Sequence, residues 1–388
     1  LHGRLQSHYV QLVRLYTDVT ALLGFRPNLH EGKVTGLAGR GRPNRGCKKV
    51  LLEIEQALNR SPIPLYFWVG LHDETLPASL EVNQRLAEEF RGRLGDFSRE
   101  DLARAVQTIT ERRILDYVRR AREETGERSL VLAGGLFANV KINLECKRLG
   151  FERIFVCPPM SDEGLSLGAA LLAAVEHWKE PFPSRPAPDM FLGDAPDAAS
   201  LAGLLDAMGI VSVQPENIQR AIAEELAAGK TVARVLGAME FGPRALGHRS
   251  IFYQPTDPSV NDWLNRKLHR SEFMPFAPVV RIERAPELFR ELQGAELTAR
   301  FMTICLPCKP GFKKACPAVV HADNTARPQL VDRKTAPDTY AILEHYEALT
   351  GLPAFINTSF NVHDEPIVHS YEDAIAAFFQ SELDVLAI

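Results

Sequence analysis

The 388-residue sequence has no uninterrupted apolar run of the roughly 18 residues that a membrane-spanning helix needs. The apolar run from Leu165 to Val175 is too short and is ended by Glu176. The sequence also lacks a basic excess, because its net charge is −4, whereas general binders of nucleic acid or membrane surfaces usually carry positive charge. We therefore expect a cytoplasmic protein that binds neither a membrane nor nucleic acid.

Cysteine is also scarce, with six residues spread irregularly along the chain. This pattern excludes a disulfide scaffold and favours a reducing compartment. Cys305 and Cys308, followed by Cys316 and His321, could form a zinc site, but a second paired set of ligands is absent. Three ordinary half-buried thiols are the simpler interpretation of these cysteines.

The sequence does not begin with methionine, and its first residues already predict a helix. Between Leu5 and Leu23, apolar residues recur at spacings of three and four, and Gly24 supplies a stop signal. A sequence that opens inside an amphipathic helix, without a signal peptide, is expected to be cut from a longer one.

The segment 180–189 contains four prolines, which cannot lie within a helix or a central strand. We interpret this segment as a stiff linker between a first domain, residues 1–179, and a second, residues 190–388.

The first domain reads as layers of helix and strand. Ser98 and Asp101 predict a capping box for a helix that runs to Gly126. Two apolar runs, 129–133 and 153–157, predict buried strands. Ser161 is expected to cap a further helix over residues 162–178. This alternation predicts an α/β domain.

The second domain alternates in a similar way. The sequence predicts helices at 216–228 and 340–350, with strands at 231–236 and 354–356. Ser370 with Asp373 indicates a capping box for a last helix. The intervening region, about 237–335, predicts loops and short strands, where binding groups usually lie.

Two segments of the first domain could bind a ligand. Gly134 and Gly135 follow a predicted strand and could bring backbone N–H groups to an anion, with Asn139 and Asn143 on one helix face. A tight turn without a ligand explains the glycines equally simply. Asp162 could hold a metal, although an acidic residue in a first helical turn is also explained by the helix dipole.

The densest concentration of donors lies in the second domain. Residues 237–250 contain three glycines, one proline and two arginines, Arg244 and Arg249, whose planar guanidinium groups suit phosphate oxygens. Further donor-rich segments follow, with Lys267 and Arg270, His321 and Arg327, and Asn357 and Ser359. A single arginine is equally well explained by a surface ion pair. If the segments converge, they would form a basic cradle for a small phosphorylated anion.

Taken together, seven motifs resemble those of the carbamoyltransferase family of nodulation and antibiotic-tailoring enzymes. They occur in the family's order over nearly the whole sequence, and the ordered set is far more specific than any one motif. The motifs are His30-Glu-Gly-Lys33-Val-Thr-Gly-Leu-Ala38, Leu132-Ala-Gly-Gly135, Ser161-Asp-Glu-Gly-Leu-Ser-Leu-Gly168, Glu240-Phe-Gly-Pro-Arg-Ala-Leu-Gly247, Glu272-Phe-Met-Pro-Phe-Ala-Pro278, Thr325-Ala-Arg-Pro-Gln329 and Asn357-Thr-Ser-Phe-Asn361.

The resemblance implies an α/β protein with part of an actin-like ATPase (Kae1-like) domain followed by a YrdC-like domain. It also implies an enzyme that activates carbamoyl phosphate with ATP, bound with Mg²⁺, to carbamoyl adenylate. The carbamoyl group then passes to the hydroxyl of a small molecule, such as a nodulation-factor sugar, an antibiotic or another secondary metabolite. Fe²⁺ or another divalent metal is implied for this second step, and a homodimer is left open.

The resemblance also implies roles for individual residues. Four positions match those expected to hold carbamoyl phosphate or the nucleotide phosphates and form the predicted catalytic set: Arg244, Arg270, Arg327 and Asn357. Asp162 matches the metal-ligand aspartate. The residues expected to contact substrate or nucleotide are Glu31, Lys33, Gly134, Gly135, Asn139, Lys267, His321 and Ser359.

The sequence departs from the family pattern in two places. Ala238 stands where an arginine is common, and the paired metal-binding histidines are not found, so we expect them before Leu1. Three alternatives stay open. They are a tRNA threonylcarbamoyl-adenosine-type modifying enzyme, a truncated and catalytically incomplete binding module, and an actin-like sugar or acetate kinase, which leaves everything after residue 190 unexplained.

Overall fold

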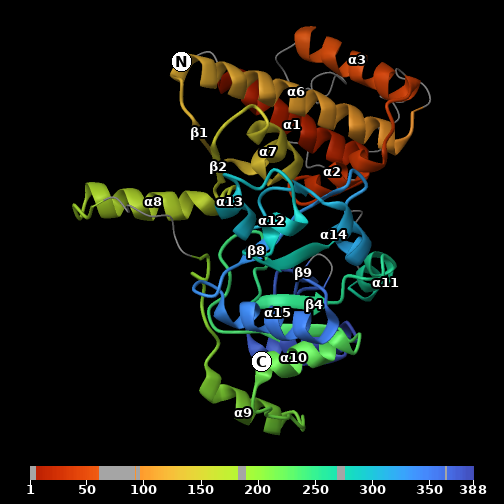
Figure 1. Ribbon diagram of the computed structural model, residues 1–388. Coiled ribbons are helices and arrows are strands. Elements are labelled where there is room, and N and C mark those ends of the chain that lie inside the picture. Colours follow the sequence, from red (N-terminus) through yellow and green to blue (C-terminus); the bar gives the residue numbers. More distant parts are fainter. Residues whose placement is uncertain (1–5, 61–91, 93–96, 182–188, 269–275, 363–364) are drawn as a thin grey trace. The chain divides into compact units, whose positions relative to one another are not determined.

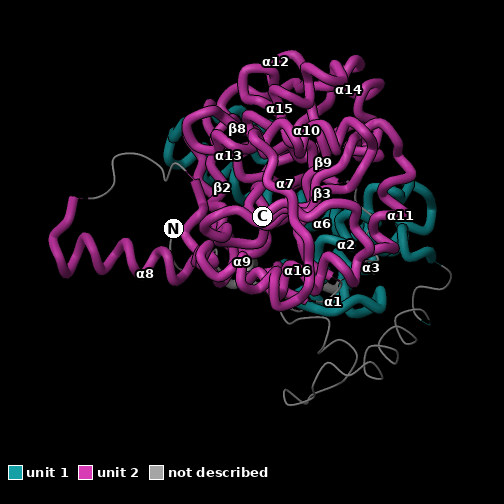
Figure 2. Tube along the Cα trace, turned by 90° about the horizontal axis from the view of Figure 1, so that it is seen from below, with its two compact units in different colours: residues 1–128, 145–151, 272–274 teal, residues 129–144, 152–271, 275–388 magenta. Residues whose placement is uncertain are grey.

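The computed structural model describes most of the chain and divides it into two compact units (Figure 2). The described residues are 6–60, 92, 97–181, 189–268, 276–362 and 365–388. Unit 1 consists of residues 1–128, 145–151 and 272–274, and unit 2 of residues 129–144, 152–271 and 275–388.

The regular secondary structure in the described residues of unit 1 is helical. Its helices are α1 (Gln6–Leu22), α2 (Glu31–Arg40), α3 (Arg45–Arg60) and α6 (Arg99–Thr125). The predicted capping box of α6 is confirmed, because the Ser98 hydroxyl accepts from the Asp101 amide and the Asp101 carboxylate accepts from the Ser98 amide. Gly126 ends the helix with φ 69°, the left-handed conformation that glycine adopts without strain.

Helix α6 is the centre of unit 1, since α1, α2 and α3 all pack against it. Gly41 allows the close approach of α2, because a Cβ at this position would lie 2.7 Å from the Glu100 carbonyl oxygen. One buried polar contact joins the helices, with the Tyr16 hydroxyl donating to Gln107 Oε1 at 2.8 Å. Burial raises the pKa of Tyr16, so its phenol stays protonated and available as a donor.

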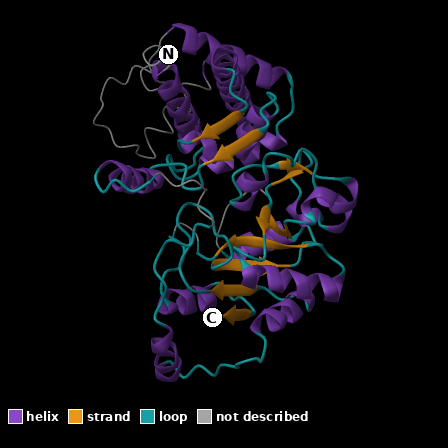
Figure 3. Ribbon diagram, turned by 60° about the vertical axis from the view of Figure 1, so that its left-hand side comes forward, coloured by secondary structure: helices purple, strands orange, loops and turns teal. Residues whose placement is uncertain are grey.

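Unit 2 is built on a mixed sheet, whose strands are the lower group of arrows in Figure 3. The sheet has six strands in the order β10-β3-β4-β9-β5-β8. The outer pairs β10–β3 and β5–β8 are parallel, and the pairs between them are antiparallel. The strands are β3 (Val232–Val235), β4 (Arg249–Tyr253), β5 (Ala277–Arg281), β8 (Gln329–Val331), β9 (Ala354–Ser359) and β10 (Val385–Ala387). A small antiparallel pair also forms between β6 (Leu306–Pro307) and β7 (Thr325–Ala326).

Helices α10 (Ile218–Ala227) and α15 (Pro337–Thr350) lie side by side against the sheet (Figure 1). They bury the principal core of unit 2, in which Phe252 and Phe355 have ring centroids 4.8 Å apart. The remaining helices are α9 (Ala198–Ala207), α11 (Val260–Lys267), α12 (Ala285–Leu288), α13 (Glu296–Arg300), α14 (Pro310–Ala315), the 3₁₀ helix η2 (Pro317–Val319) and α16 (Tyr371–Gln380).

A second, two-stranded parallel sheet also belongs to unit 2. It pairs β1 (Ser129–Leu132) with β2 (Arg153–Val156). Strand β2 also makes hydrogen bonds to residues outside this sheet. The Ile154 amide donates to the Gly294 carbonyl, and the Ile154 carbonyl accepts from the Thr298 hydroxyl. These bonds explain why both strands cluster with residues from the second half of the chain. The flanking elements are the 3₁₀ helix η1 (Gly135–Ala138), α7 (Val140–Lys147) and α8 (Glu163–Glu176).

The predicted elements are largely confirmed, with four corrections. The strand predicted as buried at 129–133 forms as β1 but is mostly exposed, with Val131 70% exposed. The strand predicted at 354–356 extends to Ser359, so Asn357 lies within it. Ser161 does not cap α8, whose N-cap residue is Asp162 and makes no side-chain capping bond. The described part of the region 237–335 contains four short α-helices and one 3₁₀ helix besides loops and strands. Within the described residues no helix could cross a membrane, and most of the predicted linker lies outside them.

We predict that Ser98→Ala lowers the free energy of unfolding by about 1 kcal/mol, because α6 loses its N-terminal capping box. Urea denaturation followed by far-UV circular dichroism measures this loss. Ser166→Ala is the matched control, since Ser166 lies on the exposed surface of α8 and its removal should change stability by less than about 0.5 kcal/mol. Equal effects of the two substitutions would contradict the role of the capping box.

Candidate functional site

The loop that joins β3 to β4 is organised by one buried carboxylate. Oε1 of Glu240 accepts hydrogen bonds from the backbone amides of Leu246, His248 and Arg249, at 2.6, 2.8 and 3.2 Å. The side chain of Glu240 is only 5% exposed. Charge-assisted bonds to three amides hold the loop in one shape, since a buried carboxylate without them would be strongly unfavourable.

Two further contacts hold the same loop in place. Leu246 is buried in a small apolar cluster that includes Met190 and Phe301. Gly247 has φ 117°, where an L side chain is strained, and a Cβ there would lie 2.7 Å from the Thr339 hydroxyl. The loop therefore requires a glycine at this position for both conformation and space.

The two loop arginines have different environments. Arg249 is fully buried, and its guanidinium donates to the carbonyls of Leu236, Gly237 and His248 at 2.9–3.0 Å. These bonds join the two ends of the loop, so the guanidinium of Arg249 stabilises the fold and is not available to a ligand. The predicted anion-binding role therefore falls to the other arginine, Arg244.

Arg244 is half-buried but has few partners. Its Nη2 makes one long hydrogen bond of 3.4 Å to the carbonyl oxygen of Ala138, and its Nε is buried and has no partner within the described residues. Burial lowers the pKa of Arg244 to about 10, and the charge of Glu163 partly offsets this effect. At neutral pH the guanidinium therefore carries its full charge with unused donors.

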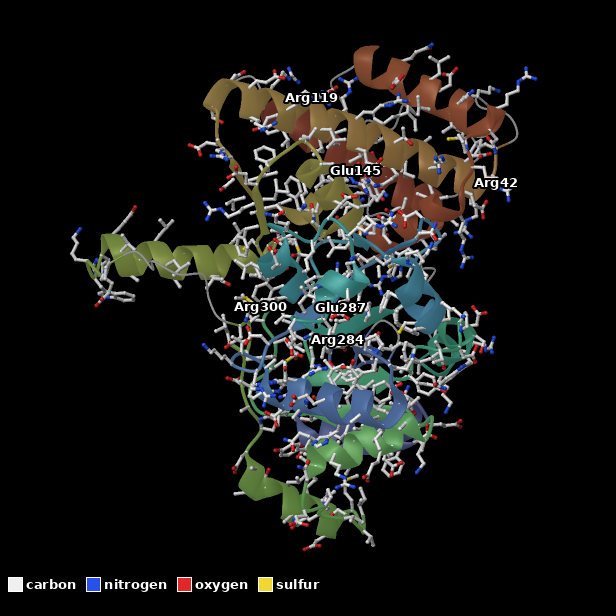
Figure 4. All side chains as sticks on the ribbon, in the orientation of Figure 1. Arg42, Arg119, Glu145, Arg284, Glu287 and Arg300 are labelled. Carbon is white, nitrogen blue, oxygen red and sulfur yellow. The ribbon has the colours of Figure 1, made fainter. Side chains whose placement is uncertain are left out.

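Two other arginines of unit 2 are paired with carboxylates. Arg284 lies 2.5 Å from Glu287, and Arg300 lies 3.5 Å from Asp332; Figure 4 labels Arg284, Glu287 and Arg300. Among the described residues, Arg244 makes no comparable salt bridge. This difference distinguishes an arginine available to a ligand from arginines engaged in surface ion pairs.

Asn357 tethers the loop from β9. Its side-chain Nδ2 donates to the carbonyl of Ala245 at 3.1 Å and to Oε1 of Gln329 at 2.7 Å. Gln329 in turn donates to the carbonyl of Leu246 at 2.7 Å. Both amides are buried. Asn357 therefore holds the residues next to Arg244, which is a positioning role in addition to any contact with substrate.

A second polar group surrounds the turn before β7. The Asp323 carboxylate lies 2.8 Å from Lys141 Nζ and accepts from the hydroxyl and the amide of Thr325. These bonds lower the pKa of Asp323 to about 2 against the opposing effect of burial. His321 contacts the same hydroxyl, and burial lowers its pKa to about 4, helped by the charges of Arg327 and Lys141.

The segment after β1 lies beside both groups. Gly134 has φ 115° and donates to the Met160 carbonyl, and Gly135 begins η1. Asn139 caps α7, because its Oδ1 accepts from the Ile142 amide at 3.3 Å. Through Ala138 this segment contacts Arg244, and through Lys141 it contacts Asp323. The structure thus brings three donor-rich segments of unit 2 together.

The other predicted site residues lie elsewhere. Lys267 donates to the Glu382 carbonyl, near the start of β3 and opposite the end from which the loop leaves. Ser359 donates to Asn361 at the end of β9. Glu31 and Lys33 lie in unit 1, on α2. Arg270 lies outside the described residues. The roles predicted for all these residues stay predictions.

The described residues do not fit an iron site. Asp162 is exposed at the start of α8, and the described part of the chain holds no group of three or more His, Cys, Asp or Glu side chains placed to share a metal ion. The thiols considered as zinc ligands, Cys305, Cys308 and Cys316, are buried, as ordinary packing residues are, and burial raises the pKa of Cys308 and Cys316 to about 12.

One charged residue of this region was missed by sequence reasoning. Arg234 lies on β3, is 3% exposed, and contacts the Thr339 hydroxyl at 3.3 Å and Asp338 at 3.7 Å. Burial lowers its pKa to about 10, and the charges of Asp338 and Glu240 oppose this shift. The sequence does carry a signal for this residue, because Arg234 is the one charged residue within the apolar strand Val232–Val235.

Comparison with known proteins agrees with these motifs. Residues 3–171 match the family model for the carbamoyltransferase N-terminus, and residues 223–388 match the model for the carbamoyltransferase C-terminus. The chain belongs to the carbamoyltransferase family, as its motifs predicted, and this is a family of transferases.

Curated relatives extend beyond the present chain. An uncharacterized protein of Methanocaldococcus jannaschii, MJ1058, is 34% identical over 96% of this chain and 60% of its own length. Nodulation protein NolO of Bradyrhizobium diazoefficiens is 32% identical over 92% of this chain and 64% of its own length. The chain thus spans about 60% of these relatives. The solved structure of full-length HypF, in a phosphate- and nucleotide-bound form, aligns with a TM-score of only 0.33 at 20% identity over 44% of this chain and 21% of that one, too distant to support an argument.

We predict that Glu240→Gln accelerates hydrogen exchange at the backbone amides of Leu246, His248 and Arg249. The neutral amide weakens three charge-assisted bonds, each worth on the order of 1.5–3 kcal/mol. Exchange followed by mass spectrometry or NMR measures the effect. Amides of α10, which do not contact Glu240, serve as the internal control. Unchanged protection of the loop would show that another contact determines its shape.

Proposed function

We propose that the protein of which this chain is part is an O-carbamoyltransferase, and that unit 2 forms carbamoyl adenylate from carbamoyl phosphate and ATP. The acceptor is then the hydroxyl of a small molecule. Family membership supports the class of reaction. The nodulation proteins among the relatives favour an acceptor of the kind found in specialised biosynthesis.

The single observation that carries the proposal is the state of Arg244. Its loop is held by Glu240, Asn357 and Gln329, yet the guanidinium itself makes only one long hydrogen bond to the part of the chain that the structure describes. A fixed backbone that presents a charged group with unused donors is suited to bind phosphoryl oxygens. Arg327, close enough to influence the pKa of His321, adds a second cation to the same region.

The chemistry suits these residue types. Carbamoyl phosphate first loses phosphate to water, which gives carbamate. A carbamate oxygen then attacks the α-phosphate of ATP, the bond to the β-phosphate oxygen breaks, and pyrophosphate leaves. Negative charge builds on the phosphoryl oxygens, so catalysis depends mainly on positioning and on neutralising charge. Arg244 would supply this neutralisation, and its cationic state at neutral pH is what the step requires.

The first test is carbamoyl-phosphate-dependent exchange of pyrophosphate into MgATP. We predict that Arg244→Ala lowers this exchange more than about tenfold, because a charge-assisted contact worth on the order of 1.5–3 kcal/mol is lost. Arg244→Lys should restore it only in part, since lysine lacks the bidentate fork. Arg220→Ala, which removes an exposed arginine paired with Glu224, is the control. Full exchange by Arg244→Ala would refute the assignment.

A second test asks whether Asn357 acts through the loop. Asn357→Ala should weaken exchange in the wild-type background by displacing Ala245 and its neighbour Arg244. In the Arg244→Ala background the same substitution should have little further effect, because the group that it positions is gone. The double-mutant cycle should show a coupling of about 0.5–3 kcal/mol. Additive effects would mean that Asn357 contributes independently.

A further inference from the structure

The proton on the His321 ring can be placed from the hydrogen bonds around it. The Thr325 hydroxyl lies 2.6 Å from Asp323 Oδ1 and 3.0 Å from His321 Nδ1. Asp323, with a pKa of about 2, is an acceptor only, so the single hydroxyl proton of Thr325 is donated to it. The hydroxyl oxygen must therefore accept from Nδ1. Nδ1 carries the proton of the neutral ring.

The other ring nitrogen, Nε2, is consequently a bare acceptor. It is shielded from solvent and has no hydrogen-bond partner among the described residues. The ring stays neutral because burial and the charges of Arg327 and Lys141 outweigh the opposing charge of Asp323. A buried acceptor without a donor is unusual in folded proteins and requires an explanation. The positive charges of Arg327 and Lys141 disfavour protonation of the ring, and the same charges attract an anion to its vicinity.

A ligand that satisfies this arrangement must combine an anionic group with a hydrogen-bond donor close to it. The phosphoryl group of an acyl phosphate, when fully ionised, offers oxygen acceptors only and would repel the lone pair of Nε2. Carbamoyl phosphate offers both parts, because its amide –NH₂ is separated from the phosphate by one carbonyl carbon and one oxygen. Acetyl phosphate has the same charge and a similar shape, but a methyl group replaces the amide.

We propose that His321 Nε2 accepts a hydrogen bond from the –NH₂ group of carbamoyl phosphate and so selects the carbamoyl group over other acyl phosphates. Asp323 and Thr325 act as positioning residues, since they place the proton on Nδ1 and leave Nε2 as the acceptor. The inference rests on the proposed function and adds the residue that determines acyl specificity. In this proposal Arg244 and Arg327 bind the phosphate group of the ligand, whereas His321 accepts a hydrogen bond from its –NH₂ group.

The test compares the binding of carbamoyl phosphate and acetyl phosphate to the full 388-residue chain, by calorimetry or by competition. The wild type should prefer carbamoyl phosphate by about tenfold or more, because acetyl phosphate leaves the acceptor unpaired. His321→Leu should reduce this preference to near unity, mainly by weakening carbamoyl phosphate. His321→Gln, which can present an amide oxygen near the position of Nε2, should retain part of it. The control His369→Leu removes an exposed histidine and should leave the preference unchanged.

A second readout does not depend on binding. In ¹⁵N-histidine-labelled protein at pH 7, the resonance pair lost in His321→Leu should report a neutral ring protonated on Nδ1. Thr325→Val, which keeps the branched shape but removes the hydroxyl, should shift the ring away from this tautomer and lower the preference for carbamoyl phosphate. A proton on Nε2, or a charged ring at pH 7, would overturn the proposal even if His321→Leu fails to fold.

The outcomes separate the two levels of inference. If the wild-type chain binds neither acyl phosphate and shows no carbamoyl-phosphate-dependent exchange, the proposed function itself fails. If it binds carbamoyl phosphate but His321→Leu keeps the wild-type preference over acetyl phosphate, only the role of His321 fails. Equal binding of the two acyl phosphates by the wild type also removes the role of His321 and leaves the anion site intact.

Discussion

The candidate site depends on one buried negative charge, the carboxylate of Glu240. Its Oε1 atom accepts hydrogen bonds from three backbone amides of the loop between β3 and β4. The arrangement is self-consistent, since the buried charge needs the amides and the irregular backbone needs an acceptor for them. Arg249, Asn357 and Gln329 then satisfy the carbonyls that the loop leaves over.

The polar groups of unit 2 thus include some that hold the backbone and some whose donors or acceptors are left without partners among the described residues. Arg249 is bonded to three carbonyls, whereas Arg244 on the same loop keeps free donors. The turn before β7 shows the same division, since Asp323 is engaged by Lys141 and Thr325 while one nitrogen of His321 is left over. The groups left over are the cationic guanidinium of Arg244 and the neutral acceptor Nε2 of His321. A small anion that also carries a hydrogen-bond donor would complement both groups.

Local features were predictable from the sequence, and tertiary ones were not. The capping boxes at Ser98 and Ser370 depend on residues three positions apart, so the pattern alone defines them. The register that places Asn357 inside β9 depends on pairing with β4, which no local signal contains. The glycine-rich context of Arg244 marks it as a candidate anion-binding residue. The different roles of Arg244 and Arg249 become clear only from the burial and hydrogen bonds of each side chain in the structure. The hydrogen bond from the Lys267 ammonium to the carbonyl of Glu382 joins residues 115 positions apart, so no local pattern predicts it.

The rigidity of the loop has a consequence for the thermodynamics and kinetics of association. Because both ends of the loop continue directly into paired strands, Arg244 is presented on a backbone whose shape exists before any ligand arrives. The loop then loses little conformational entropy when an anion binds. Most of the free energy of the contacts therefore contributes to affinity. An anion should enter this part of the site in a single fast phase whose rate rises linearly with concentration, without a slower rearrangement. Slower phases in the reaction would then originate in chemistry or in other parts of the enzyme.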